Sequence, residues 1–198
     1  DSVYIFDNEC KRDVKTLLYA MNEVNELHNV KMFILDNMMQ IETKNTNNIY
    51  QEQSEIMEQL RTFAVNKNVH IVLVAHPKKD QDNLVRANIY SVSGSMNITN
   101  KAYNVISLIR VDHLDKDTRE YKALKKYLLS NKYDIEECDQ IVEVLKTKGE
   151  GCGVLGLQYD PLKKTYIELD KLTDKEVEEL KRDSDYGFRK ANFKTPFD

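Results

Sequence analysis

The 198-residue sequence contains no tryptophan, only 6 glycines and only 3 prolines. Because glycine and proline are the residues that most often interrupt helices and strands, their shortage argues against long flexible linkers. The cysteines, Cys10, Cys138 and Cys152, are odd in number and far apart, which excludes a disulfide framework or a closely spaced zinc site and suits a reducing compartment. No apolar run approaches membrane-spanning length and no secretory apolar region is present, so we expect a cytoplasmic protein without a membrane partner.

An excess of positive charge is absent as well. The 29 lysines and arginines are outnumbered by 33 aspartates and glutamates, and the formal net charge is −4. This balance excludes a uniformly basic coat, so any nucleic-acid contact has to be a local patch. Hydrophobic residues make up 41% of the chain and charged residues 31%, which is typical of a soluble globular domain with its own core.

The most informative stretch that is present is Lys31–Ile41, KMFILDNMMQI. Its apolar run, Met32–Leu35, leads directly into Asp36, which predicts a strand buried on both faces with a carboxylate at its carboxyl end. Open α/β sheets bind ligands at that end of their strands, and a carboxylate there is the pattern of a Walker B segment that holds the Mg²⁺ of a nucleotide. Taken alone, the pattern is more often a buried strand that ends in a turn aspartate.

Apolar periodicity predicts alternating strands and helices in the first half of the chain, which is the pattern of parallel βαβ units. The expected elements are a strand at Val3–Phe6, a helix from an Asp13 N-cap to His28–Asn29, a helix from Ile49 to about Val65, and a strand at His70–Ala75 that closes on His76.

The second half predicts a mixture of strands and helices followed by a hairpin. The expected elements are a turn at Ser91–Ser95 that opens a short helix to about Tyr103, a strand at Val105–Val111, a helical stretch at Asp115–Lys132, a strand at Ile141–Leu145, and a hairpin of Val154–Tyr159 with Thr165–Leu169. Thr173 and Glu176 form a capping box, with Leu172 and Val177 placed as a hydrophobic staple, which predicts a last helix over 174–181.

Four features, in this order and spacing, resemble the RecA-like motor domain of DnaB-type hexameric replicative helicases. They are a strand ending in Asp36, a strand ending in His76 before Pro77-Lys78-Lys79, Ser93-Gly94-Ser95 before a helix and the VISLIR strand, and Lys146-x-Lys148 with glycines before a closing hairpin. The His-Pro-Lys-Lys stretch is most similar to the Twinkle and phage primase-helicase branch, and the resemblance covers Val3–Leu169. It implies an α/β fold: a partial RecA-like, mainly parallel sheet flanked by helices, with a carboxyl-terminal β-hairpin.

The resemblance also implies roles for single residues. Asp36 would be the Walker B acid, a catalytic and nucleotide-binding residue that holds Mg²⁺. His76 would be a catalytic switch that senses the γ-phosphate, although a lone histidine at a strand end is otherwise a hydrogen-bonded structural residue. Lys78, Lys79 and Arg86 would lie on a DNA-binding loop that contacts the phosphates of single-stranded DNA, and a solvated loop is the competing interpretation.

Lys146 and Lys148 would bind the nucleotide of the neighbouring subunit, because this family places its ATP sites between identical subunits of a ring. Lys148 stands where the family usually has a catalytic arginine finger, and lysine carries the charge without the planar bidentate fork. A pair of exposed lysines at a strand end is the competing interpretation.

The family's phosphate-binding loop is missing, since no G-x-x-x-x-G-K-S/T occurs in the chain. We therefore expect residues 1–170 to be a partial RecA-like motor domain without its phosphate-loop strand, with 112–140 as a candidate insertion, and 171–198 to be a carboxyl-terminal helix and tail. The resemblance implies ATP and Mg²⁺ as cofactors of an intact parent protein. We expect this truncated chain alone to bind neither and to be inactive.

Two functions from different classes remain open. The first is a fragment of an ATP-dependent replicative DNA helicase, a hydrolase that moves along single-stranded DNA as a ring. The second is a non-catalytic, degenerate RecA-like accessory or DNA-binding protein. A RecA/RadA-type recombinase is disfavoured by the His-Pro-Lys-Lys loop.

The missing strand would lie between His70–Ala75 and Val105–Val111, which would leave each of them with an unpaired edge. We expect these edges to close on each other, or the chain to associate with a second copy, because segment 112–140 is too hydrophilic to supply a buried strand.

Overall fold

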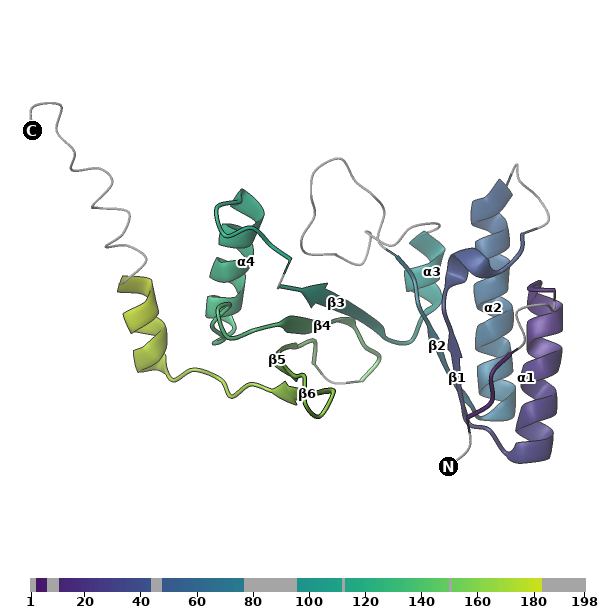
Figure 1. Ribbon diagram of the computed structural model, residues 1–198. Coiled ribbons are helices and arrows are strands. Elements are labelled where there is room, and N and C mark those ends of the chain that lie inside the picture. The colour runs from purple at the N-terminus through teal and green to yellow at the C-terminus, as the bar shows by residue number, and fades with distance from the viewer. Residues whose placement is uncertain are drawn as a thin grey trace, which may run out of the picture. The chain divides into compact units, whose positions relative to one another are not determined.

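The computed structural model describes residues 3–6, 11–43, 48–76, 96–111, 113–149 and 151–182. The chain forms two compact units (Figure 1). The first unit comprises residues 1–82 and 87–105, and the second comprises residues 83–86 and 106–198. Each unit has its own sheet, helices and hydrophobic core.

The first unit is built on a parallel pair of strands. β1 (Met32–Leu35) lies beside β2 (His70–Leu73) in a register that pairs Met32 with His70 and Leu35 with Leu73. The helices of this unit are α1 (Val14–His28), α2 (Ile49–Lys67) and α3 (Met96–Lys101), and a 3₁₀ turn, η1 (Met38–Gln40), follows β1. Because α2 connects the two parallel strands, the predicted βαβ unit is confirmed.

Short-range hydrogen bonds explain where these helices begin and end. The Asp13 carboxylate caps α1 by accepting from the backbone N–H groups of Lys15 (3.0 Å) and Thr16 (3.2 Å). Asn29 ends α1 and Asn68 ends α2, both in the left-handed conformation that asparagine adopts more readily than most residues. The predicted cap at Asp13 and the predicted end at Asn29 are confirmed.

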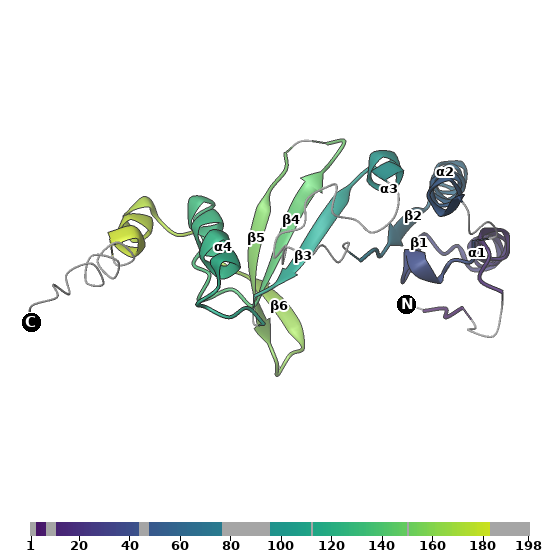
Figure 2. The same ribbon diagram turned by 90° about the horizontal axis from the view of Figure 1, so that it is seen from above.

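The hydrophobic core of the first unit lies on one face of the strand pair, the face on which α1 and α2 lie (Figures 1 and 2). Its buried members are Leu17, Met38, Ile41, Ile56, Met57, Leu60 and Ile98. Leu35 and Ile71 pack against this core from the sheet, whereas Met32 and Ile34 on the opposite face are 58% and 65% exposed. The prediction that β1 is buried on both faces is therefore wrong, because the described residues cover one face only.

The expected strand at Val3–Phe6 is not formed. Val3 and Ile5 are 88% and 91% exposed, and no described strand pairs with this segment. A short apolar run becomes a strand only where a neighbour accepts its backbone hydrogen bonds, and the run alone does not provide one.

The second unit is a four-stranded sheet with one helix packed on it. The sheet order is β3 (Val105–Arg110), β4 (Gln140–Lys146), β5 (Val154–Asp160) and β6 (Thr165–Glu168), and the helix is α4 (Arg119–Ser130). Figure 2 shows β3, β4 and β5 side by side. β4, β5 and β6 pair antiparallel, and β5–β6 is the predicted hairpin.

The core of the second unit is formed by the buried face of α4 and one face of the sheet. Its buried members are Ile109, Val111, Tyr121, Leu124, Leu128, Tyr133, Ile135, Cys138, Ile141 and Val154. The α4 face agrees with the helical spacing that the sequence predicted. On the opposite face of the sheet, Ile106 and Leu108 are 58% and 65% exposed.

A last helix, residues 174–182, follows the second sheet. The predicted capping box is confirmed, since the Thr173 backbone N–H donates to the Glu176 carboxylate at 2.7 Å and the Glu176 N–H donates to the Thr173 hydroxyl at 3.4 Å. The Lys132 ammonium pairs with Asp174 at 2.8 Å, and Val177 is buried. These contacts attach the last helix to the second unit.

β2 and β3 belong to different sheets. In the part of the chain that the structure describes, β2 pairs with β1 alone and β3 pairs with β4 alone. The structure therefore does not show the direct closure of the two edges that the sequence led us to expect. The α/β fold class is confirmed, and the boundary proposed at residue 170 stays a prediction. No helix in the described ranges has both the length and the apolar character needed to cross a membrane.

Candidate functional site

The carboxyl ends of β1 and β2 carry two residues that the sequence singled out, Asp36 and His76. Strand pairing continues past the end of β1, since the Val74 N–H donates to the Leu35 carbonyl at 2.9 Å and the Met38 N–H donates to the Val74 carbonyl at 3.0 Å. These bonds fix both chain segments at the same edge of the sheet. The structure therefore brings Asp36 and His76 to the edge at which open α/β sheets bind their ligands.

Asn37, which the sequence analysis did not single out, connects the two strand ends. Its side-chain oxygen accepts from the backbone N–H of Met39 at 2.9 Å and so caps η1. This bond directs the amide nitrogen of Asn37 toward Nε2 of His76, 3.0 Å away. Because an amide nitrogen can only donate, Nε2 of His76 is the acceptor in this contact.

Asp36 provides one carboxylate that could bind a metal ion, and it is not part of a cluster of metal-binding side chains among the described residues. It is exposed, and the described residues contain no group of three or more His, Cys, Asp or Glu side chains that could hold a metal ion. Mg²⁺ is commonly bound through one or two carboxylates, with phosphates of a nucleotide and water completing its octahedron. The residues present therefore fit Mg²⁺ that arrives with a nucleotide, and do not fit a resident structural metal.

Lys146 and Lys148 lie in the second unit. Lys146 is the half-buried last residue of β4, and Lys148 is exposed in the turn that follows. Thr147, between them, accepts the backbone N–H of Gly149 through its hydroxyl at 3.0 Å. Gly151, further along the loop, has a φ of 75°, which favours glycine. A polar turn therefore presents Lys148, while a strand positions Lys146.

The predicted DNA-binding residues Lys78, Lys79 and Arg86 lie outside the described residues, and so do Pro77 and Ser93–Ser95. Their role stays a prediction.

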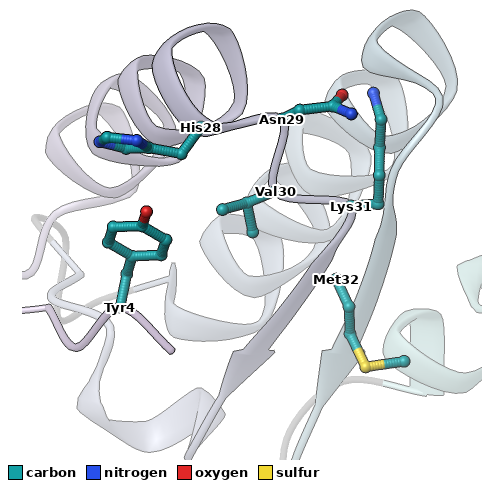
Figure 3. Close-up of a pocket in the computed structure, with 6 residues that line it drawn as sticks. All are labelled: Tyr4, His28, Asn29, Val30, Lys31 and Met32. Atoms are coloured by element: carbon teal, nitrogen blue, oxygen red, sulfur yellow. The ribbon is translucent and has the colours of Figure 1, made fainter. Parts of the chain in front are cut away.

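An open pocket of about 450 Å³ lies at the amino end of β1 (Figure 3). It is lined by Tyr4, His28, Asn29, Val30, Lys31 and Met32. The Tyr4 and His28 rings stack with their centroids 4.6 Å apart. Asp36 and His76 follow the carboxyl ends of the same strand pair, so this pocket is separate from the candidate site.

The second unit contains ionisable groups whose pKa values burial perturbs. Burial raises the pKa of the Cys138 thiol to about 11, and the nearby carboxylate of Asp134 adds to the shift. Burial also raises the pKa of Tyr121, whose hydroxyl donates to the Glu136 carboxylate at 2.7 Å. Both groups belong to the packed core, so a structural cause explains these shifts better than a catalytic role does.

The parallel strand pair with its α2 crossover, and the polar residues at the carboxyl ends of both strands, are features of an open α/β sheet, and they agree with the RecA-like fold that the sequence led us to expect. Comparison with solved structures supports this fold. The chain is similar to a DnaB-like replicative helicase whose structure was determined to study its interactions with primase, with a TM-score of 0.61, 14% identity, and coverage of 80% of this chain and 35% of that chain. It is also similar to the ATPase domain of a second protein, with a TM-score of 0.58, 17% identity, and coverage of 80% of this chain and 52% of that chain.

A third structure, the KaiC-like protein PH0186 from Pyrococcus horikoshii OT3, has a TM-score of 0.49 and 14% identity, with coverage of 79% of this chain and 57% of that chain. No protein-family model matches the sequence, and no curated protein sequence matches it. The chain thus spans 35% and 52% of the lengths of the first two structures. The resemblance inferred from the sequence is confirmed at the level of the fold.

Proposed function

We propose that the chain is part of the motor domain of an ATP-dependent replicative DNA helicase. The intact protein would move along single-stranded DNA as a ring, with ATP sites between its subunits. The observation that carries the proposal is the pair Asp36 and His76 at the carboxyl ends of neighbouring parallel strands, in a fold similar to that of a replicative helicase and of an ATPase domain. The activity is assigned to a longer protein, because the chain spans only 35% of the similar helicase.

Asp36 would hold Mg²⁺ together with the phosphates of ATP, and the bound ion would neutralise charge on the β- and γ-phosphates. Nε2 of His76 is occupied by the Asn37 amide, which leaves the Nδ1–H to donate to a phosphate oxygen. Pro77 and Lys78 follow His76 directly in the sequence. A shift of His76 between nucleotide states would therefore reach the proposed DNA-binding loop through the backbone.

Lys78, Lys79 and Arg86 would contact phosphates of the single strand inside the ring. Lys146 and Lys148 would bind the nucleotide held by the neighbouring subunit, with Lys148 in the place of an arginine finger. Lysine supplies charge there without bidentate geometry, so we expect Lys148→Arg to preserve or increase ATP hydrolysis in the assembled protein.

The experiment that tests the proposal uses the longer protein that contains this chain. Asp36→Ala should lower ATP hydrolysis at least about 100-fold, because a preorganised charge at the reacting phosphates is lost. Glu23→Ala removes an exposed carboxylate from α1 and is the matched control, which should hydrolyse ATP normally. His76→Ala should reduce stimulation by single-stranded DNA more than it reduces the basal rate. Normal hydrolysis by the Asp36 variant would refute the proposed site.

The DNA-binding loop has its own test. Replacing Lys78 and Lys79 with alanine should weaken single-stranded DNA binding and lower the slope of log affinity against log salt by about 1.4, since two phosphate contacts are lost. Replacing Lys11 and Lys15, which are exposed on the first unit, removes the same charge elsewhere and should leave the slope unchanged. Equal slopes in both double variants would assign Lys78 and Lys79 to a solvated loop.

The 198-residue chain by itself is expected neither to bind ATP tightly nor to hydrolyse it, because the backbone amides and lysine of a phosphate-binding loop are missing. Isothermal calorimetry and a steady-state ATPase assay measure this. Micromolar affinity or steady turnover by the purified chain would contradict the expectation.

A second candidate function is a non-catalytic RecA-like accessory or DNA-binding protein, and the missing G-x-x-x-x-G-K-S/T motif favours it. The coding sequence upstream of Asp1 separates the two candidates. A phosphate-binding loop encoded there supports the motor, whereas a start codon at or near Asp1 supports the degenerate protein.

A further inference from the structure

Helix α4 has a cationic side that faces away from the core. Arg119, Lys122 and Lys126 are exposed, and the second and third of them lie three and seven residues after the first on α4. At 3.6 residues per turn, this spacing puts them on one side of the helix, opposite the residues that pack into the core. We call these three residues the outer face of α4.

No acid within α4 shares this face. Glu120 is the single carboxylate within α4, and it is half-buried. Lys122 donates to the backbone carbonyl of Asp117 at 3.1 Å, and Arg119 and Lys126 form no ion pair with the described residues. None of the three cations of the outer face is therefore held in an ion pair with a described carboxylate.

Glu136, an acidic residue that packs beside α4, is used elsewhere. The Glu136 carboxylate pairs with Lys116, contacts Lys125 at 4.0 Å and accepts from the Tyr121 hydroxyl. The hydrogen bond from Lys116 is the largest cause that lowers the pKa of Glu136, so this carboxylate is held charged at the side of α4. Glu136 thereby compensates the charges of Lys116 and Lys125, and it forms no ion pair with the outer face of α4.

A solvated helix face usually mixes both signs, with acids and bases three or four residues apart that stabilise the helix. The outer face of α4 instead places like charges at those spacings, which destabilises a helix. The chain as a whole is acidic, with a net charge of −4, so a concentration of cations at one place is not a consequence of composition. An arrangement that weakens the isolated helix is expected where an anionic partner compensates it.

We propose that the outer face of α4 binds the phosphate backbone of double-stranded DNA without regard to sequence. The three cations extend over about 10 Å of helix, and a duplex offers one phosphate charge per roughly 1.7 Å of its axis. The remaining residues exposed on this side of α4, Ala123 and Ser130, are not aromatic. Binding to single strands usually adds stacked bases on exposed aromatic side chains, so a cationic face without them fits a duplex better.

This surface is distinct from the loop proposed to contact single-stranded DNA, and it requires no nucleotide. Its test is therefore independent of the helicase assignment. Failure of the longer protein to hydrolyse ATP would refute the proposed function and leave duplex binding by α4 untouched. Absence of duplex binding would refute the present inference and leave the proposed function untouched.

The test compares the 198-residue chain with a triple variant in which Arg119, Lys122 and Lys126 are replaced by glutamine. Glutamine favours a helix about as well as lysine or arginine, and circular dichroism checks that the variant folds. Fluorescence anisotropy with a short labelled duplex gives the affinity at several salt concentrations. The triple variant should have a slope of log affinity against log salt that is smaller in magnitude by about 2.7 than the slope of the unchanged chain. Between about 50 mM and about 200 mM salt, the variant should therefore lose about 40-fold less affinity than the unchanged chain.

The matched control replaces Lys15, Lys163 and Lys175 with glutamine. These lysines are exposed and lie off α4, and both triple variants change the net charge from −4 by −3 to −7. The control should bind the duplex as the unchanged chain does, and two unrelated duplex sequences should bind equally well. The single strand of the same sequence should bind more weakly than the duplex.

Three outcomes would overturn the proposal. The first is equal duplex binding by the unchanged chain and the α4 variant. The second is tighter binding of the single strand that the α4 variant loses, which would assign the face to a different partner. The third is binding to anionic phospholipid vesicles that depends on α4 while duplex binding does not.

Discussion

Gly156 in β5 faces the core of the second unit, and its replacement by alanine tests the packing there directly. A β-carbon built on Gly156 would lie 2.9 Å from the Cys138 sulfur, 2.9 Å from Cδ1 of the Tyr133 ring and 3.3 Å from its Cγ. Ordinary contacts begin at 3.4 Å, so two of these atoms must move by at least 0.5 Å (3.4 − 2.9). Neither can yield easily, since Cys138 is 5% exposed and Tyr133 is 1% exposed.

Overpacking of this kind costs about 1–3 kcal/mol. A glycine-to-alanine change without a clash gains about 0.4–1 kcal/mol, because the unfolded chain loses freedom. Gly153 provides that reference, since a β-carbon there would meet nothing within 4 Å and its φ is not positive. The two alanine variants should therefore differ in free energy of unfolding by about 1–3 kcal/mol, the clash alone.

Urea denaturation measures the difference. The absence of tryptophan makes far-ultraviolet circular dichroism the general signal, and the reactivity of the buried Cys138 thiol reports on the second unit specifically. With a urea dependence of about 1–3 kcal/mol per molar, Gly156→Ala should unfold about 1 M earlier than Gly153→Ala. Adding Cys138→Ala to Gly156→Ala removes one clashing atom and should recover part of the loss. Equal midpoints for the two single variants would refute the packing described here.

Four further predictions concern the cysteine reactivity, stability and association of the chain. An alkylating reagent at mildly alkaline pH should modify Cys152, which is exposed, well before Cys138, as peptide mass spectrometry would show. The Cys138 thiol has a pKa of about 11 in the folded state against an ordinary value of 9.0, so the unfolded state loses this proton first as pH rises. The free energy of unfolding should therefore fall between these two pKa values. A free energy of unfolding that does not change over this pH range would contradict the burial of Cys138. Light scattering should detect self-association of the chain that Ile34→Thr with Leu108→Thr reduces, since both side chains are exposed and apolar. Thr118→Ala should destabilise α4 by about 1 kcal/mol, because the hydroxyl accepts the backbone N–H of Tyr121 at 3.2 Å, and unchanged thermal unfolding would exclude that cap.

The sequence predicts well those features that neighbouring residues determine. The Asp13 cap, the Asn29 helix end and the capping box of Thr173 with Glu176 depend on hydrogen bonds that span a few residues, and the structure confirms each of them. The strands at Met32–Leu35 and in the hairpin follow from apolar runs bounded by polar turns. In all these cases the information lies within one element or its immediate flanks.

Features that depend on distant partners are predicted less well. The segment Val3–Phe6 has the composition of a strand but lacks a described neighbour. Ser107 is 7% exposed while Leu108 is 65% exposed, the reverse of what the polarity of the two side chains predicts. Which face of a strand is covered depends on helices that the strand's own sequence does not encode.

The candidate site shows the same division. Asp36 and His76 were predicted from the ends of two apolar runs, and parallel pairing brings both to one edge. Asn37 was missed because an asparagine after an aspartate is typical of an ordinary turn. The signal that could have identified it is its position as the cap of a 3₁₀ turn, which fixes its amide toward the neighbouring strand.

The two open sheet faces indicate what the sequence is adapted to. Strands that face water on one side usually carry polar residues there, whereas strands covered on both sides are apolar throughout. The strand MFIL is apolar throughout, and VISLIR is apolar apart from Ser107 and its last residue, Arg110. The described residues nevertheless leave Met32, Ile34, Ile106 and Leu108 more than half exposed. Residues of this kind would be replaced by polar ones if water were their permanent neighbour, because contiguous exposed apolar surface promotes aggregation. The apolar pattern is therefore that of strands covered on both faces, whereas the described residues cover one face of each sheet, and this difference is why the burial of β1 was predicted wrongly.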